Sequence, residues 1–371
     1  MKNILITGAN GFIGKNLTAG FRHRDEFELF LIDKEDTAET LEDYITRSDI
    51  IFHLAGVNRP KEESEFETGN VGILENVLEL CLKHNKKIPV VLTSSIQSDL
   101  DNPYGISKRR AEEMLMKYGI DNDVKVYVYR LKNVFGKWCR PNYNSAVSTF
   151  CHNIANDLPI TVSDRENVVN LVYIDDIVEK FIKITGNKYQ DKEKFYHEID
   201  ISYSKNLGEI TDLLYKFRAS RENCMLPDVN DGFEKKLYST YLSYLPEDHF
   251  SYPLKMNVDE RGSFTEFIKS DERGQVSINI SKPGITKGNH WHNTKTEKFL
   301  VVSGKGVIRF RHIHSNEILE YFVSGDKLEV VDIPPGYTHN ISNHGDSDMV
   351  TVMWANEKFD PENPDTYYLK V

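Results

Sequence analysis

The chain has 371 residues, a length that suggests two domains of ordinary size. Its Asp and Glu outnumber Lys and Arg by 57 to 46, and the resulting net charge of −11 excludes general affinity for nucleic acid or anionic membranes. No apolar run approaches the ~20 residues of a membrane span, no secretory leader is visible, and the four cysteines form no CxxC pair. We therefore expect a cytoplasmic protein with reduced thiols.

Short apolar runs alternate with amphipathic stretches through the first half of the chain. Buried strands are predicted at 2–6, 29–32, 50–54, 90–92 and 124–129, and helices at 72–84 and 107–118. Strands that are covered on both faces read as continuous apolar runs. The alternation therefore predicts an α/β, Rossmann-like doubly wound parallel sheet.

The pattern changes near residue 250, beyond which helical periodicity is scarce. Short strand-like runs separated by Gly and Pro turns occur at 275–280, 298–302, 307–311, 318–322, 327–332 and 349–354. Many short strands at near-even spacing predict an all-β sandwich or barrel. The segment 244–257 contains two prolines and is the predicted linker, so we place the domains at 1–245 and 246–371.

A glycine-rich loop, TGANGFIG at 7–14, follows the first predicted strand and opens a helix. Gly8 permits a tight turn, Gly11 lets the backbone approach a pyrophosphate, and Gly14 lets the helix pack closely on the strand. The phosphates would lie at the positive end of that helix. The spacing is GxxGxxG rather than GxGxxG, and a tight turn without a ligand is the alternative.

Asp33 lies at the end of the second predicted strand, nineteen residues after Gly14. An acid at this place usually binds the ribose hydroxyls of NAD and repels the 2′-phosphate of NADP. Lys34 is adjacent and could instead pair with that phosphate. An ordinary strand-end aspartate is the remaining interpretation, so this segment leaves both coenzymes open.

A YxxxK pair, Tyr104 and Lys108, places both side chains on one helix face, one turn apart. We expect the lysine to lower the phenol pKa from about 10, because it favours the phenolate. Ser94 and Ser95 end a predicted strand and could hydrogen-bond the same substrate carbonyl. We favour Ser95, although the strand register does not decide between them, and a chance YxxxK is the alternative.

Together with HLAG (53–56), RLKNVFG (130–136) and VYIDDI (172–177), these motifs resemble the extended short-chain dehydrogenase/reductase family over roughly residues 1–245. The resemblance implies that Tyr104 is the catalytic acid, that Lys108 orients the tyrosine and the ribose, and that many relatives act on nucleotide sugars. It implies a nicotinamide site formed by Gly8, Asn10, Gly11, Phe12, Ile13, Gly14, Asp33, Lys34, Leu54, Ala55, Gly56 and Lys108.

The second half contains a candidate metal-binding set. His290 and His292 form an HxH pair that would face one side of a strand, Glu297 follows five residues later, and His339 ends a PPGYTH segment. Three imidazoles and a carboxylate suit Zn²⁺ or another divalent transition metal. Ordinary surface or core histidines are the alternative. A second alternating pair at 312 and 314 is interpreted as exposed or packing residues.

The metal set resembles the two motifs of the cupin superfamily, which predicts an all-β cupin barrel with His290, His292, Glu297 and His339 as ligands. Its glycines, proline and asparagine would be Gly284, Gly304, Gly325, Pro334, Gly336 and Asn343. Cupins include epimerases, dioxygenases, isomerases and plain binding modules, so the fold alone does not determine the chemistry.

A reductase followed by a cupin resembles a family of capsular polysaccharide biosynthesis proteins over the whole chain, through segments such as 135–145, 259–269 and 280–295. The resemblance implies a homodimeric, bifunctional enzyme that uses one divalent metal, Zn²⁺, and NADPH, with NADH as the alternative. The cupin would invert C3 of a UDP-2-acetamido-2,6-dideoxy-4-ketohexose. The reductase would then reduce the C4 ketone, giving a UDP-6-deoxy-talosamine derivative on the route to UDP-N-acetyl-L-fucosamine for capsule or O-antigen polysaccharide.

Two other interpretations of the chain stay open. In one, the protein is a monofunctional 4-ketoreductase whose cupin is a structural or dimerising module. In the other, it is a sugar-sensing or scaffold protein with degenerate sites, against which the complete Tyr104–Lys108 pair argues. The base for C3 is not identified by the sequence, and Tyr337 and the unligated histidines are the candidates.

Overall fold

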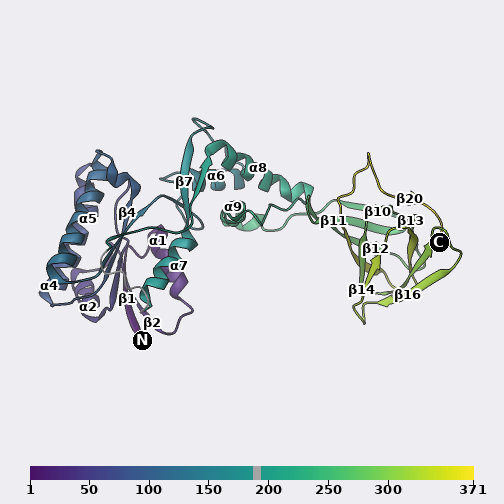
Figure 1. Ribbon diagram of the computed structural model, residues 1–371, viewed down its shortest axis with the longest axis horizontal. Coiled ribbons are helices and arrows are strands. Elements are labelled where there is room, and N and C mark those ends of the chain that lie inside the picture. The colour runs from purple at the N-terminus through teal and green to yellow at the C-terminus, as the bar shows by residue number, and fades with distance from the viewer. Residues whose placement is uncertain (187–193) are drawn as a thin grey trace. The chain divides into compact units, whose positions relative to one another are not determined.

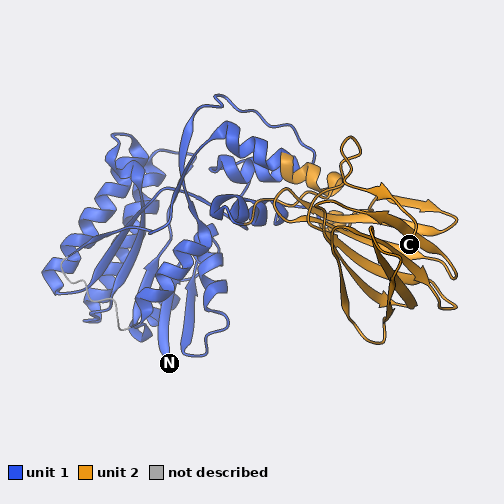
Figure 2. Ribbon diagram, turned by 45° about the vertical axis from the view of Figure 1, so that its right-hand side comes forward, with its two compact units in different colours: residues 1–215, 230–246 blue, residues 216–229, 247–371 orange. Residues whose placement is uncertain are grey.

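The computed structural model describes residues 1–186 and 194–371. The chain divides into two compact units, one of residues 1–215 and 230–246, the other of residues 216–229 and 247–371 (Figure 2). Within the described ranges, no helix has both the length and the apolar character needed to cross a membrane.

The first unit is built on a six-stranded sheet in the order β2-β1-β3-β4-β5-β8, in which every neighbouring pair is parallel (Figure 1). The strands are β1 (Lys2–Thr7), β2 (Phe27–Ile32), β3 (Ile50–His53), β4 (Val90–Ser95), β5 (Val126–Leu131) and β8 (Tyr196–His197). The predicted doubly wound sheet is therefore confirmed. The chain reverses its direction across the sheet between β1 and β3, the place where such sheets bind ligands.

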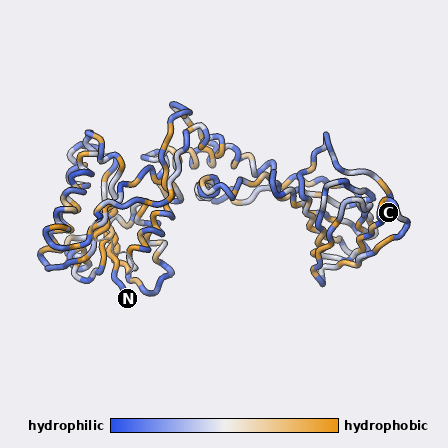
Figure 3. The backbone as a smooth tube through the Cα atoms, viewed as in Figure 1, coloured by the Kyte–Doolittle hydropathy of each residue, from blue (hydrophilic) through white to orange (hydrophobic). Residues whose placement is uncertain are grey.

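Helices cover both faces of this sheet, and each face has its own core. One face packs against α2 (Ala38–Arg47), α4 (Ile73–Lys83) and α5 (Pro103–Asn122), and the other against α1 (Phe12–Phe21) and α7 (Ile174–Thr185). The central strands are mostly orange in Figure 3, as buried parallel strands require. The short α3 (Ser64–Phe66) and a π-helical segment (Glu67–Gly72) precede α4, and a 3₁₀ turn (Ile96–Asp99) follows β4.

A small three-stranded sheet completes the unit, with the order β6 (Asn133–Phe135), β7 (Val168–Tyr173), β9 (Tyr203–Asn206). The helices α6 (Ala146–Ala155) and α9 (Gly232–Leu242) also belong to this unit, whereas α8 (Leu207–Asn223) crosses the division at residue 215. The sequence patterns did not predict these strands: β6 and β9 have only three and four residues, and in β7 the apolar run VVNLVY is interrupted by Asn170.

The second unit consists of two antiparallel sheets, in the orders β10-β11-β12-β19-β14-β17 and β16-β15-β18-β13-β20. Phe299, Ile308, Phe310, Ile341 and Met349 are buried between them. The strands are β10 (Met256–Asp259), β11 (Gly262–Ser270), β12 (Gly274–Ser281), β13 (Thr286–Trp291), β14 (Glu297–Ser303), β15 (Lys305–His312), β16 (Ile318–Ser324), β17 (Val330–Ile333), β18 (Tyr337–Asn343), β19 (Met349–Ala355) and β20 (Tyr367–Tyr368). The predicted all-β cupin barrel is confirmed.

The pattern missed β13 and β18, whose sequences TKGNHW and YTHNISN are polar although they pair in the middle of a sheet. In these strands His290 and His339 belong to the candidate metal cluster and other polar side chains hydrogen-bond one another, as Thr286 does with Ser342, so the apolar alternation on which strand prediction depends is missing. The pair at 312 and 314 does not lie on one strand, because β15 ends at His312 and His314 falls in the following turn. Both are exposed, as expected.

Candidate active site and metal centre

The glycine loop between β1 and α1 has the backbone geometry that its sequence predicts. Gly8 has a φ of +70°, a left-handed conformation that side-chain-bearing residues rarely adopt. A Cβ at Gly14 would lie 2.2 Å from the carbonyl oxygen of Gly8, so only glycine lets α1 start this close to β1. Gly11 is the N-cap of α1, and no side chain caps this helix. The positive end of α1 is therefore open to an anion.

A cavity of about 700 Å³ opens from this loop across the carboxyl ends of β1, β3, β4 and β5. Nine of the predicted cofactor residues line it: Gly8, Asn10, Gly11, Phe12, Ile13, Gly14, Leu54, Gly56 and Lys108. The cavity is also lined by residues for which no role was predicted, although they fall in the segments 130–136 and 135–145 that carry the family resemblances: Lys132, Asn133, Trp138, Arg140, Tyr143 and Asn144. Most of these lie in the segment after β5, where no periodic pattern marks them.

Asp33, Lys34 and Ala55 do not line the cavity. Asp33 instead supports the loop, because its Oδ2 accepts a hydrogen bond of 2.7 Å from the backbone N–H of Asn10. The Lys34 side chain is exposed, and its Nζ lies 3.5 Å from Glu35. The structure thus brings the acid close to the glycine loop and leaves the lysine in solvent.

Tyr104 and Lys108 occupy the first turns of α5, whose N-cap Asn102 accepts a hydrogen bond from the N–H of Gly105. The Lys108 ammonium lies 5.9 Å from the centre of the Tyr104 ring and donates to the carbonyl oxygen of Thr93. Both Tyr104 and Lys108 line the cavity.

Burial, not the neighbouring lysine, sets the pKa of Tyr104. Burial raises this pKa above its usual value of about 10, and a hydrogen bond with the Ser95 hydroxyl opposes the shift. The expectation that Lys108 lowers the phenol pKa is therefore wrong for this state, since the ammonium is directed to a backbone carbonyl. Burial also lowers the pKa of Lys108 to about 8, while Glu112 acts in the opposite direction.

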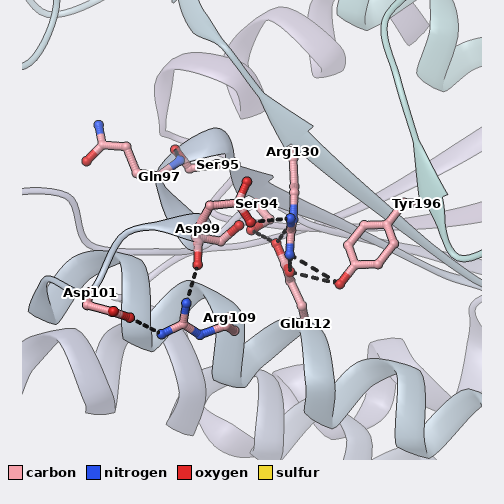
Figure 4. Close-up of polar contacts among 10 residues, drawn as sticks. Ser94, Ser95, Gln97, Asp99, Asp101, Arg109, Glu112, Arg130 and Tyr196 are labelled. Carbon is pink, nitrogen blue, oxygen red and sulfur yellow. Dashed lines mark hydrogen bonds and ion pairs between the residues drawn. The ribbon is translucent and has the colours of Figure 1, made fainter.

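The two serines at the end of β4 have different partners. The Ser95 side chain interacts with Tyr104 and accepts a hydrogen bond from the N–H of Gln97. Ser94 is buried, and its hydroxyl donates to Glu112, which is held by Arg130 (Figure 4). The geometry therefore favours Ser95 as the hydroxyl available to a substrate carbonyl.

The candidate metal ligands form one cluster in the cupin barrel. The ligand atoms of His290, His292, Glu297 and His339 all lie within 4.8 Å of one another. His290 and His339 face each other across β13 and β18, next to a bulge after Gly288. Glu297 begins β14, and its Oε2 lies 3.3 Å from the Nε2 atoms of both His292 and His339.

Backbone carbonyls orient two of these imidazoles. Nδ1 of His292 lies 2.5 Å from the carbonyl oxygen of Asp365, and Nδ1 of His339 lies 3.4 Å from that of Tyr337. A carbonyl oxygen accepts a hydrogen bond from Nδ1–H, so Nε2 of each ring keeps its lone pair for a metal.

The protonation states also suit a metal. Burial lowers the pKa of His290 to about 4, and the neighbouring His339 adds to the shift. Burial alone would raise the pKa of Glu297, but the His292 and His339 imidazoles outweigh it and hold this pKa well below its usual range. Neutral imidazoles and an ionised carboxylate are the forms that bind a divalent cation.

One buried atom in the cluster is left without a hydrogen bond. Nε2 of His339 is among the buried polar atoms of the described chain that have no partner of suitable geometry, although the Glu297 carboxylate is near. A buried polar atom normally has a partner, and a metal would provide one here. The donors and their spacing therefore fit Zn²⁺ or another divalent transition metal.

An acid near the C-terminus holds the loop between the candidate ligands His292 and Glu297. The Asp365 carboxylate accepts hydrogen bonds from the backbone N–H groups of residues 293, 294 and 295, at 2.9, 2.7 and 2.8 Å. Beyond it, β20 pairs with β13 at His290 and Trp291. Sequence reasoning missed Asp365, because an isolated acid about 70 residues after its partners carries no local pattern.

Comparison with known proteins agrees with both halves. Residues 4–197 match the NAD dependent epimerase/dehydratase family, and residues 257–367 match the polysaccharide biosynthesis C-terminal domain. A UDP-2-acetamido-2,6-beta-L-arabino-hexul-4-ose reductase from Pseudomonas aeruginosa is 46% identical over 368 residues, which is 99% of this chain and 98% of the relative.

Solved structures show the same architecture. The capsular polysaccharide assembling protein CapF from Staphylococcus aureus has 56% sequence identity and a TM-score of 0.93, with 100% of both chains covered. The UDP-glucuronic acid 4-epimerase from Bacillus cereus, solved with NAD, is 20% identical with a TM-score of 0.52, over 58% of this chain and 84% of that one. The second likeness is one of fold alone.

Proposed function

Because the chain belongs to the NAD dependent epimerase/dehydratase family and matches a UDP-sugar reductase over nearly its whole length, we propose that it is a UDP-sugar 4-ketoreductase with a second, C3-epimerase site. The substrate is a UDP-linked 4-keto-6-deoxy amino sugar, and the product is a UDP-6-deoxy-talosamine derivative on the route to UDP-N-acetyl-L-fucosamine. The observation that carries this proposal is the presence of two complete sets of reactive groups in one chain.

In the reductase unit, Tyr104 gives the proton to the C4 oxygen. Its raised pKa keeps the phenol protonated at neutral pH, which is the form that a ketone reduction requires. Ser95, which already interacts with Tyr104, hydrogen-bonds the same oxygen and aligns the ketone. The bound nicotinamide supplies the hydride. The Lys108 ammonium stabilises the phenolate that forms and holds the cofactor ribose.

We infer NADPH as the coenzyme, with NADH as the alternative. Asp33 does not line the cavity, and its Oδ2 already accepts a hydrogen bond from the glycine loop. The Lys34 ammonium is 84% exposed, and its surface ion pair is weak enough to exchange for a 2′-phosphate. A ratio of kcat/KM values for the two coenzymes tests this inference, and a Lys34→Ala variant should lower the NADPH value alone.

In the cupin unit, His290, His292, Glu297 and His339 hold one divalent metal, which we take to be Zn²⁺. A bound ion would supply Lewis-acid stabilisation of negative charge on a substrate oxygen. The 4-keto group acidifies the C3 proton, so removal of this proton and its return on the other face inverts C3. Tyr337 and His312, whose rings pack with centroids 5.0 Å apart, are the candidates for the base.

The assembly is a homodimer that forms through the cupin unit. β16 is the edge strand of its sheet, and both of its faces carry exposed apolar residues, with Phe322 73%, Ile318 50% and Tyr321 50% exposed. An exposed apolar edge strand invites pairing with another chain. A second copy is the occupant that presents a matching edge by symmetry.

The experiment that tests bifunctionality is solvent-deuterium incorporation at C3 of the UDP-4-keto sugar, followed by NMR without NADPH. Wild-type protein and a Tyr104→Phe variant should both exchange C3, whereas His290→Ala should not. His290→Ala should still consume NADPH with a C3-inverted substrate. If wild-type protein consumes NADPH without any exchange at C3, the protein is a monofunctional reductase with a structural cupin.

A further inference from the structure

A buried acid lies one helical turn beyond Lys108, behind the reductase site. Glu112 is 0% exposed, and its carboxylate accepts hydrogen bonds from Arg130 at 2.6 and 3.0 Å, from the Tyr196 hydroxyl at 3.2 Å and from the Ser94 hydroxyl. Figure 4 shows these side chains converging on the acid. A carboxylate is costly to bury, and here several donors compensate that cost.

The partners of Glu112 come from three different strands. Ser94 ends β4, Arg130 belongs to β5 and Tyr196 belongs to β8, whereas Glu112 itself is part of α5. Arg130 reaches further, with Nη1 2.7 Å from Asp99 in the turn after β4. The Glu112 side chain therefore joins α5, which carries the YxxxK pair, to the end of β4, which carries the two serines.

We propose that Glu112 is a positioning residue of the ketone-reducing site: its carboxylate engages the Ser94 hydroxyl, which leaves the Ser95 hydroxyl to Tyr104, and it places a negative charge one helical turn from Lys108. The proposal rests on the proposed reductase function. Glu112 does not line the cavity and so acts only through the residues beside it.

The surroundings of Lys108 support the electrostatic part. From its own helix, Lys108 is near Tyr104 and Glu112, and from β3 it is near His53. Burial lowers the pKa of His53 to about 3, so this histidine is neutral and adds no second positive charge beside the ammonium. Burial lowers the pKa of Lys108 to about 8, and Glu112 is the charge that opposes this shift.

The proposal is tested first by a readout that needs no substrate. The ¹³Cε resonance of Lys108, assigned with a Lys108→Arg variant in lysine-labelled protein, reports its ionisation. We expect Glu112→Gln to lower the Lys108 pKa by about one unit, as expected for the loss of a nearby charge at a partly screened distance. Asp101→Asn is the matched control, because it removes an exposed acid that pairs with Arg109 on the same helix, and it should leave the titration unchanged.

Kinetics then test the link to catalysis. The high-pH limb of kcat/KM for NADPH-dependent ketone reduction should move down by the same amount as the Lys108 titration in Glu112→Gln, and kcat should fall about tenfold with KM less affected. If the variant misfolds because Arg130 keeps only Asp99 as a carboxylate partner, the double variant Glu112→Gln, Arg130→Gln removes both charges. It should lower the Lys108 pKa by a smaller amount, because a positive charge is lost together with the negative one.

The outcomes separate the two proposals. An unchanged Lys108 titration in a folded Glu112→Gln or double variant overturns the role of Glu112, whatever the activity. A shifted titration in a protein that reduces no UDP-4-keto sugar supports the coupling and refutes the proposed function. A loss of kcat with an unshifted pH limb reduces Glu112 to a structural ion pair.

Discussion

A single added methyl group at Gly14 should separate α1 from β1 and weaken cofactor binding. The new Cβ would lie 2.2 Å from the Gly8 carbonyl oxygen and 2.8 Å from two atoms of Ala9, about 1 Å inside an ordinary carbon–oxygen contact. These neighbours are backbone atoms, so the helix has to move. Overpacking of this kind costs about 1–3 kcal/mol, and the better helix propensity of alanine returns about 1 kcal/mol, which leaves a net loss of about 0–2 kcal/mol.

The effect on the cofactor should be larger than the effect on stability. A shift of about 1 Å breaks at least one hydrogen bond between the start of α1 and a phosphate, and a hydrogen bond to a charged group contributes about 1.5–3 kcal/mol. NADPH should therefore bind Gly14→Ala at least tenfold more weakly in a fluorescence titration. Gly72→Ala is the control, since its backbone is helical and a Cβ there meets nothing closer than 4.0 Å. Wild-type affinity in Gly14→Ala would refute the close-packing argument.

Three further predictions concern metal binding, acid stability and dimer formation. Asp365→Ala removes four hydrogen bonds from the loop at residues 293–295 and should weaken Zn²⁺ binding about 10–100-fold in a chelator competition, whereas removal of the exposed Asp360 by Asp360→Ala should not. The pKa of His53 is lowered to about 3, from about 6.5 when unfolded, so the unfolded state takes up a proton first as the pH falls. Stability should therefore drop below about pH 6.5, by up to about 1.4 kcal/mol per pH unit, and calorimetry of His53→Gln should show a flatter acid dependence. Phe322→Glu places a charge on the exposed edge strand β16 and should yield monomers in analytical ultracentrifugation. Phe267→Glu, on an interior strand of the other sheet, is the control and should leave the dimer intact. A dimeric Phe322→Glu protein would exclude β16 as the interface.

The features that the sequence predicted correctly are those that depend on neighbouring residues. The glycine loop follows from the steric needs of one tight turn, and the parallel sheet follows from runs of buried β-branched residues. Three of the four candidate metal ligands also come from neighbouring residues, since His290 and His292 lie on one local segment and Glu297 follows closely, whereas His339 was added by the resemblance of the PPGYTH segment to a cupin motif. The polar strands β13 and β18 escaped prediction for the same reason, because their side chains obey the needs of a site rather than a core.

Orientation within the sites could not be predicted, because it depends on contacts between distant residues. Alternation along β4 shows that Ser94 and Ser95 face opposite sides, but not which one faces Tyr104. That choice depends on Glu112, eighteen residues from Ser94, and on Arg130. The expected effect of Lys108 on the Tyr104 phenol failed similarly, since spacing along a helix says nothing about burial or about the Thr93 carbonyl that the ammonium contacts.

In both sites, one set of residues provides the reacting atoms and another set orients them, and mutations in the two sets should have different effects. Short motifs bring the reacting atoms, and groups distant in sequence orient them: Glu112, eighteen residues away, for Ser94 in one unit, and the Asp365 carbonyl, 73 residues away, for His292 in the other. Changing a motif residue removes a reacting group outright, whereas changing a distant partner shifts a pKa or a metal affinity by degrees. The distant partners are thus the positions at which pH dependence and metal retention can be tuned without loss of the chemistry.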